Sequence, residues 1–164
     1  MEGMLETETQ PPETGFRRLH THRDRLYRTL ALAVGDASLA AEAVDEAMAR
    51  AYQRWDTVSS YENPEAWVYR VALNWSRSVF RKRHREDLWS EPPDRLVTDQ
   101  TNDPELRTAI GRLPVKLRSV VVARYLFDWS TTESAEALGV PEATVKTRLR
   151  RALALLAQDL GDEV

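Results

Sequence analysis

The chain of 164 residues carries a formal net charge of −3, with 42% hydrophobic and 30% charged residues and only six glycines. This composition is typical of a soluble, mostly helical protein, and the length suits one ordinary domain or two small ones. It excludes a simple polycation that coats nucleic acid, and the lack of cysteine excludes disulfides and thiolate metal sites. No apolar run approaches the roughly 18 residues that span a bilayer, so we expect no membrane insertion.

The N-terminal part of the chain begins with an acidic stretch that lacks the basic-then-apolar order of a secretory signal, and we expect residues 1–13 to be a disordered tail. Apolar residues at helical spacing over 16–34 then predict one helix that ends near Gly35. Asp36 is a suitable N-cap for a second helix, which we expect to run to about Trp55.

A third helix is predicted after the polar, turn-like segment 56–63, because Pro64 suits the first turn of a helix. It extends to about Arg85, and its end at 77–85 carries five Arg or Lys residues and no acid. Such a basic island in an acidic chain indicates local contacts with anions. The apolar residues of this helix follow an i, i+4 rhythm that we assign to the core: Trp67, Val71, Trp75 and Val79.

The segment 87–104 combines acids and prolines without periodicity, so we interpret it as a flexible acidic linker. A second helical block follows at 105–164. The predicted fold is therefore all-α, with two small helical lobes (14–86 and 105–164) joined by this linker.

A helix-turn-helix is predicted within the second lobe, in the stretch "STTESAEALGVPEATVKTRL". Gly139 suits the left-handed conformation that ends a helix, and Ala135 is small where two crossing helices approach each other. Leu138, Val140 and Val145 would fill the angle between the helices. In this motif the second helix lies in the major groove of DNA.

The second helix of this motif separates an apolar face from a basic one. Cations and a hydroxyl on one face suit phosphate and base-edge contacts, although a solvated basic face on an ordinary helix remains an alternative. A membrane-surface helix is less favoured because its apolar face carries no aromatic residue. The apolar face comprises Val145, Leu149, Ala152 and Leu156, with Leu153 beside it; Lys146, Thr147, Arg150 and Arg151 lie opposite, with Arg148 on the flank.

Both lobes together resemble the extracytoplasmic-function (ECF) sigma factors of bacterial RNA polymerase. The stretch 106–156, with "LPVKLRSVV" and "TVKTRL", is similar to sigma region 4. In the first lobe, "AEAVDEAMARAYQRW" (41–55) resembles region 2.2 and "NPEAWVYRVALNWSRSVFRKR" (63–83) resembles regions 2.3 and 2.4. The linker stands in place of region 3. The resemblance implies a cytoplasmic promoter-specificity subunit without catalytic chemistry or cofactor.

Recognition of the −35 promoter element is what the resemblance implies for the second lobe. By position, Thr147, Arg150 and Arg151 would contact base edges, while Lys146 and Arg148 would hold phosphates, and Thr144 lies on the same helix. Thr131 and Thr132 would bind phosphate through hydroxyls and free backbone N–H groups. The alternative for these two threonines is simple N-capping of the helix by Ser130 or a threonine.

Capture and opening of the −10 element is the role that the resemblance implies for the first lobe. Polar side chains for an extruded base and cations for the strand suit this task. Tyr61 offers a stacking surface, or else it folds back onto the lobe. The residues that would contact the −10 element are Tyr61, Asn63, Asn74, Arg77, Ser78, Arg81 and Lys82.

Protein partners also follow from the resemblance: the clamp helices of the largest polymerase subunit, the flap of the core enzyme and an anti-sigma factor. Glu42, Asp45, Glu46 and Arg50 would face the clamp helices.

Three residues depart from the family pattern: Ser78 replaces a common Asp, Met48 a Phe and Ser134 an apolar residue. A stand-alone helix-turn-helix regulator is the alternative function, and no metal, nucleophile or phosphate-loop pattern supports an enzyme.

Overall fold

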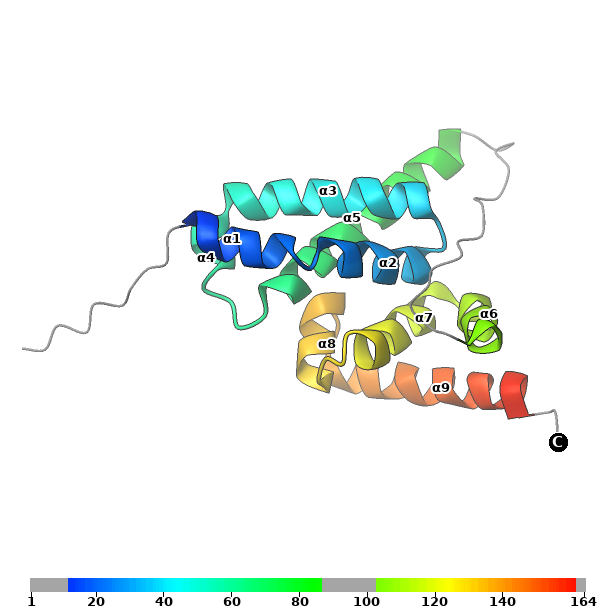
Figure 1. Cartoon of the computed structure of the whole chain (residues 1–164). Coiled ribbons are helices and arrows are strands. Elements are labelled where there is room, and N and C mark those ends of the chain that lie inside the picture. Colours follow the sequence, from blue (N-terminus) through cyan, green and yellow to red (C-terminus); the bar gives the residue numbers. More distant parts are fainter. Residues whose placement is uncertain (1–11, 87–102, 162–164) are drawn as a thin grey trace, which may run out of the picture.

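The computed structural model describes residues 12–86 and 103–161, and every regular element within these two ranges is a helix (Figure 1). The predicted all-α fold is confirmed, while most of the predicted tail and linker lies outside the described residues. The first range contains α1 (Pro12–His20), α2 (Arg23–Val34), α3 (Ala37–Gln53), α4 (Trp55–Val58) and α5 (Pro64–Glu86). The second contains α6 (Pro104–Arg112), α7 (Val115–Val121), the π-helix η1 (Val122–Leu126), α8 (Thr131–Leu138) and α9 (Glu142–Gly161).

The single helix predicted over 16–34 is wrong, because the chain turns between α1 and α2 at Thr21 and His22. The Thr21 hydroxyl donates to the backbone carbonyl of Arg18 at 2.6 Å, and this local bond competes with continuation of the helix. The end of α2 follows the prediction. Gly35 adopts a left-handed conformation with φ of 82°, and the side chain of Asp36 accepts a hydrogen bond from the backbone N–H of Leu39.

Helix α5 is more deeply embedded than its predicted apolar stripe suggests. It packs against α2 and α3 on one side and against α8 of the second lobe on the other, so more than one stripe is covered. Trp67, Val71 and Trp75 are half-buried and flank the core. The apolar residues of α5 that are almost completely buried are Ala66, Val68, Tyr69, Ala72 and Leu73.

The second lobe is built around the crossing of α7, α8 and α9. Asp103 caps α6 by accepting hydrogen bonds from the backbone N–H groups of Glu105 and Leu106, and Pro104 occupies the first turn. After η1 the chain bends through Asp128, which adopts a positive φ of 55°. Aspartate tolerates this left-handed conformation better than most residues do, so the chain can turn sharply into α8.

The two lobes pack directly on each other and share one hydrophobic core cluster. In Figure 1 the helices of the second lobe form a layer beneath α2 and α5, and the closest approaches join α5 to α8 and α2 to α7. The sequence predicts two lobes but not this contact. Among the described helices, none is both long and apolar enough to cross a membrane.

Candidate nucleic-acid interface

The turn of the predicted helix-turn-helix has the expected geometry. Gly139 follows α8 with φ of 66°, and the backbone N–H of Val140 donates to the carbonyl of Ala135 at 3.1 Å. A Cβ atom at Gly139 would lie 3.3 Å from Nε of Arg70, so glycine satisfies both the backbone conformation and a close approach of the first lobe. Leu138 and Val145 are buried at the angle between α8 and α9, as predicted.

The N-terminus of α8 is closed by a capping box. The backbone N–H of Glu133 donates to Oγ of Ser130 at 3.0 Å, and the N–H of Ser130 donates to Oε1 of Glu133 at 3.2 Å. The hydrogen bond from the Ser130 backbone is the main cause that lowers the pKa of Glu133 below its ordinary value. Ser130, not a threonine, is therefore the N-cap. Thr132 instead donates its hydroxyl hydrogen to the carboxylate of Glu142 at the start of α9.

Helix α9 presents its cations to solvent. Val145, Ala152 and Leu156 are buried against the rest of the lobe, whereas Leu153, expected beside this apolar face, is 41% exposed. Helices α6, α7 and α8 pack against α9, and Leu153 lies outside the face that they cover. The predicted −35 residues are exposed at Lys146, Thr147, Arg150, Arg151 and Thr132, and half-buried at Arg148, Thr144 and Thr131.

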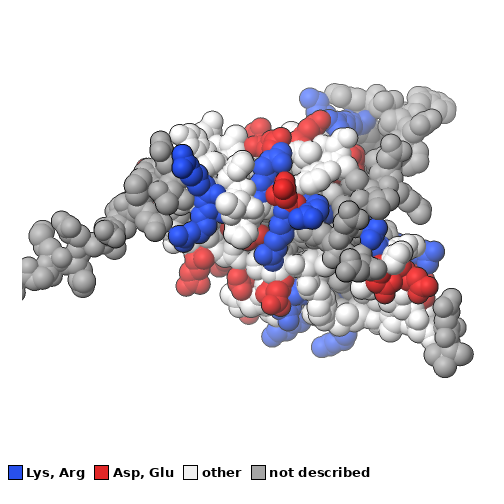
Figure 2. Space-filling model, in the orientation of Figure 1, with Lys and Arg blue, Asp and Glu red and all other residues white. Residues whose placement is uncertain are grey.

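Figure 2 shows acidic and basic side chains interleaved across the middle of one face, with basic side chains projecting at the lower edge over α9. On this face the cations form local groups among acidic side chains, which agrees with the small net charge of −3. Contacts with DNA would therefore depend on the position of each helix more than on the overall charge of the protein.

The predicted −10 residues lie along one side of α5 and in the loop before it. Tyr61 is 45% exposed, so part of this residue is accessible to solvent. Asn63 caps α5 by accepting a hydrogen bond from the backbone N–H of Ala66 at 3.1 Å. Arg77 is half-buried, and its burial is the main cause that lowers its pKa. The other predicted residues are exposed: Asn74, Ser78, Arg81 and Lys82.

The residues predicted to face the polymerase clamp lie on the outer side of α3, and each is already paired. Glu42 accepts a hydrogen bond from Arg83 of α5 at 3.1 Å, and Glu46 pairs with Arg50 one turn later at 3.1 Å. Oδ1 of Asp45 accepts a hydrogen bond from Nε of Arg23 in α2 at 3.0 Å. These pairs are solvent-exposed and contribute little to stability, so a partner can exchange them at low cost.

Four residues that the sequence analysis did not select meet at the contact between the lobes. The ring of Tyr69 is fully buried and packs edge-on against Phe127 and Trp129, at centroid distances of 5.2 and 5.5 Å. Phe127 and Trp129 are stacked at 4.0 Å, and Arg25 donates to the Phe127 carbonyl at 2.9 Å. In the sequence, this contact between the lobes is indicated only by the aromatic pair in "LFDWS". Two large rings in a turn between two helices suggest that the turn packs against another part of the chain.

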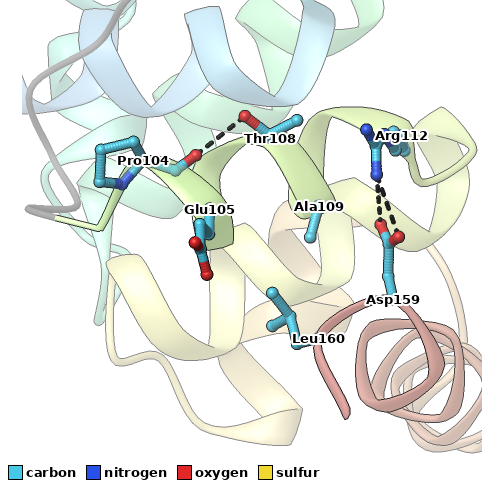
Figure 3. Close-up of a pocket in the computed structure, with 7 residues that line it drawn as sticks. All are labelled: Pro104, Glu105, Thr108, Ala109, Arg112, Asp159 and Leu160. Carbon is cyan, nitrogen blue, oxygen red and sulfur yellow. Dashed lines mark hydrogen bonds and ion pairs between the residues drawn. The ribbon is translucent and has the colours of Figure 1, made fainter. Parts of the chain in front are cut away.

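A cavity of about 320 Å³ lies between α6 and the end of α9 (Figure 3). Four of the residues that line it bond to each other in pairs: Arg112 contacts Asp159 at 3.0 Å, and the Thr108 hydroxyl donates to the Pro104 carbonyl at 2.9 Å. A ligand site requires polar groups that converge on the cavity, and these groups bond to each other instead. No cluster of three or more metal-ligating side chains occurs among the residues that the structure describes. The exposed faces of α9 and α5 remain the candidate site.

Comparisons with known proteins agree with this geometry. The sequence family Sigma-70 region 2 matches residues 19–86, and Sigma-70, region 4 matches residues 104–156. The RNA polymerase sigma-E factor of Streptomyces antibioticus is 37% identical over 147 residues, covering 87% of this chain and 82% of that protein. The ECF RNA polymerase sigma factor SigL of Mycobacterium tuberculosis H37Rv is 30% identical over 153 residues, covering 85% and 86%.

Solved structures support the fold. The sigma factor RpoE of Bartonella quintana, in complex with the anti-sigma factor NepR, superposes with a TM-score of 0.77 at 19% identity, covering 90% of this chain and 97% of that one. CnrH, in complex with the cytosolic domain of CnrY, gives 0.64 at 21% identity, covering 94% and 92%. Both regions of a sigma-70 type protein are thus present in one helical chain. The chain belongs to the extracytoplasmic-function group of RNA polymerase sigma factors.

Proposed function

We propose that this protein binds core RNA polymerase and directs transcription initiation at specific promoters by recognising −35 and −10 elements and assisting the melting of the −10 element. The observation that carries the proposal is the presence, in one sigma-70 chain, of two exposed polar and cationic helix faces, on α9 and on α5. A stand-alone regulator would need only the helix-turn-helix, and region 2 would then have no role.

Residues 105–164 are assigned to the −35 element. The N-terminal half of α9 enters the major groove, as the second helix of this motif does. The exposed guanidinium groups of Arg150 and Arg151 suit bidentate contacts with guanine, and the Thr147 hydroxyl suits either base edge. Lys146 and Arg148 hold phosphates and fix the register of the helix on the duplex.

Residues 14–86 are assigned to the −10 element and to core polymerase. The exposed ring of Tyr61 supplies a face on which an unpaired base can stack, and Asn74 and Ser78 supply polar edges on the adjoining helix. Arg77, Arg81 and Lys82 follow the backbone of the single strand. Stacking combined with backbone cations is the usual basis of single-strand binding.

The outer face of α3 is assigned to the clamp helices of the largest polymerase subunit, with the flap as a second contact of the enzyme. Basic residues on the clamp would replace Arg83 and Arg23 as partners of Glu42 and Asp45. An anti-sigma factor is a further partner, because the similar structures hold RpoE with NepR and CnrH with CnrY. The protein acts where chromosomal DNA is transcribed, which in bacteria is the cytoplasm, and it needs no cofactor and performs no catalysis of its own.

The test is reconstitution with core polymerase on templates whose −35 and −10 elements are randomised, followed by sequencing of the transcripts. We expect one pair of elements to be enriched, and Arg150→Ala with Arg151→Ala to abolish the enrichment of the −35 element while core binding is retained. Asp45→Ala with Glu46→Ala serves as the opposite control, since it should weaken core binding while the preference for the −35 element is retained. A protein that binds DNA tightly alone but neither binds core enzyme nor initiates would refute the proposal.

A further inference from the structure

Three half-buried arginines from different helices have no carboxylate partner. They are Arg77 of α5, Arg118 of α7 and Arg148 of α9, and we call them the arginine cluster. No ion pair joins any of them to an acidic side chain among the residues that the structure describes. Charges that are partly withdrawn from water are normally paired, because their loss of hydration is costly. The arginine cluster therefore lacks a counterion.

The arginines converge on the buried hydroxyl of Tyr69. This residue is 0% exposed, and its hydroxyl has no hydrogen-bond partner among the described residues. Burial raises the pKa of the phenol, and the positive charges of Arg77 and Arg118 oppose the rise, so both guanidinium groups lie near the hydroxyl. Burial is also the main cause that lowers the pKa of Arg77, and the charge of Arg148 lowers it further. Helices α5, α7 and α9 thus each contribute one cation to the same region.

Arg118 reaches this region through a space that a glycine leaves open. Its Nη1 atom lies 3.4 Å from the position that a Cβ atom would take at Gly35, the last residue before α3 begins its cap. The same atom donates to the Gly111 carbonyl at 3.4 Å, which is long for an N–H···O bond. Its Nε atom is buried and has no hydrogen-bond partner in the described part of the chain. The guanidinium group is therefore held in place while its donors are poorly used.

An acceptor is what this region lacks. A guanidinium group carries five N–H donors and no acceptor. Of the four side chains only the Tyr69 hydroxyl can accept a hydrogen bond, and its own hydrogen would then still lack an acceptor. Buried polar groups without protein partners are satisfied in native proteins by ordered water or by a bound ion. Water would satisfy the hydroxyl but leave three positive charges uncompensated, whereas an anion would do both.

We propose that the arginine cluster and the Tyr69 hydroxyl form a binding site for a phosphate group, either the free anion or the phosphate of a nucleotide. The tetrahedral oxygens of a phosphate point in several directions, so one group can accept hydrogen bonds from α5, α7 and α9 together. Arginine pairs with phosphate through two parallel N–H···O bonds. A carboxylate offers one charge and two oxygens in a single plane, and chloride offers one charge without directed lone pairs.

The site is distinct from the promoter contacts. Tyr69 and Arg118 are assigned to neither promoter element, and Arg77 and Arg148 are assigned to different ones. All three arginines are only half-buried, so each has atoms that solvent, and hence an anion, can reach. The proposal does not depend on the proposed function, because binding of phosphate is measured on the free chain without polymerase or DNA.

Thermal unfolding of the full chain in phosphate-free buffer provides the first test. Inorganic phosphate at millimolar concentration should raise the unfolding midpoint by several degrees, because a ligand that binds only the folded state stabilises it. Sodium chloride at the same ionic strength is the reference, since it screens charges without offering a tetrahedral oxyanion. Equal midpoints in phosphate and chloride would overturn the proposal.

Two substitutions that remove the same charge test the position of the site. Arg118→Gln should weaken phosphate binding in calorimetric titrations roughly tenfold, the effect expected for loss of one charged hydrogen bond. Arg28→Gln is the matched control, because Arg28 is exposed on α2, and its affinity for phosphate should be unchanged. Equal weakening by both substitutions would show that phosphate responds only to overall charge, and the site would then be refuted.

Tyr69→Phe separates binding from folding. The substitution keeps the ring that packs on Phe127 and Trp129 and removes only the hydroxyl. In phosphate-free buffer the variant should unfold at a higher temperature than the unsubstituted chain, because it no longer buries a hydroxyl without a partner. This advantage should shrink in phosphate, since only the unsubstituted chain gains the additional hydrogen bond. A difference that is the same in both buffers would contradict a role for the hydroxyl in binding.

Pyrophosphate and ADP distinguish the two sources of the phosphate group. Tighter binding of ADP than of pyrophosphate would identify a nucleotide as the ligand, whereas equal or weaker binding of ADP would identify the free anion. Either result supports the site when Arg118→Gln weakens both ligands and Arg28→Gln weakens neither. Absence of binding by inorganic phosphate, pyrophosphate and ADP would overturn the proposal.

Discussion

Thr132 and Glu142 are joined side chain to side chain, with the threonine hydroxyl donating to the carboxylate across the turn of the helix-turn-helix. The bond connects the first turn of α8 to the first residue of α9 and so helps to fix the crossing of the two helices. It also holds a negative charge at the N-terminus of α9, the end that approaches DNA in this motif. We therefore expect Glu142 to lower the affinity of α9 for DNA while it supports the motif.

The first prediction follows from this pair. Glu142→Gln keeps an acceptor for the Thr132 hydroxyl but removes one negative charge close to the DNA backbone, so duplex affinity should rise several-fold at low salt. The increase should be the same for cognate and scrambled −35 sequences, because the change is electrostatic. Fluorescence anisotropy with both duplexes measures it. Binding that stays equal or weakens on both would show that Glu142 does not face the backbone.

Two cations on the exposed face of α9 should behave differently. Arg150→Ala should weaken binding to the cognate −35 element by about 1–3 kcal/mol and relax specificity, if Arg150 contacts a base. Lys146→Ala should weaken binding to all sequences alike and reduce the salt dependence, as expected for a phosphate contact. Titrations on cognate and scrambled duplexes at several salt concentrations separate the two. Equal losses on both duplexes for Arg150→Ala would contradict its assignment as a base reader.

Local signals in the sequence predict much of the fold. Gly35, Asp36 and Gly139 end or begin helices where expected, because each acts through its own backbone or a residue three positions away. The exposed cations of α9 follow from helical spacing in the same way. The turn at Thr21 is missed because the apolar pattern continues through it.

Contacts between distant residues are what the sequence does not predict. Tyr69 and Trp129 are 60 positions apart, and nothing in the spacing of either one indicates the other. Tyr69 lies between the half-buried residues of the predicted stripe, and it packs against Phe127 and Trp129 of the second lobe. The sequence predicts the polar and cationic faces of α5 and α9 but not that the two lobes pack against each other.

Ser134 supplies a stability prediction. Its side chain is 0% exposed, and its hydroxyl has no hydrogen-bond partner among the described residues. A buried hydroxyl without a partner costs about 1–3 kcal/mol, so Ser134→Ala should increase the free energy of unfolding by about 1 kcal/mol. Ser76→Ala is the control, since the equally buried Ser76 hydroxyl donates to the Ala72 carbonyl at 2.8 Å and its loss should not stabilise the protein. Urea unfolding measures the unfolding free energy of both variants. Equal changes for Ser134→Ala and Ser76→Ala would show that the unpartnered hydroxyl of Ser134 does not destabilise the protein.

Glu133 predicts how the protein responds to acid. Hydrogen bonds from Ser130 and Asn63 lower the pKa of this carboxyl below its ordinary value of 4.5, so the ionised form is favoured in the folded state. Its contribution to stability is therefore fully present above pH 4.5 and is lost as the pH falls through the lowered pKa. The difference in unfolding free energy between the unsubstituted chain and Glu133→Gln should shrink over that range. A difference that stays constant from pH 6 to pH 3 would show that the carboxylate charge has no such role.

Gly139 and Gly111 should respond in opposite directions to the same substitution. Gly139→Ala places a Cβ atom on a residue with φ of 66° and 3.3 Å from Arg70, so it should destabilise the protein by about 1 kcal/mol or more. Gly111→Ala in α6 meets nothing within 4 Å and lacks a positive φ, so it should stabilise the protein by about 0.4–1 kcal/mol through the unfolded chain. Thermal unfolding of the two variants measures both signs. Stabilisation by Gly139→Ala, or destabilisation by Gly111→Ala, would contradict the explanation from backbone conformation and close approach.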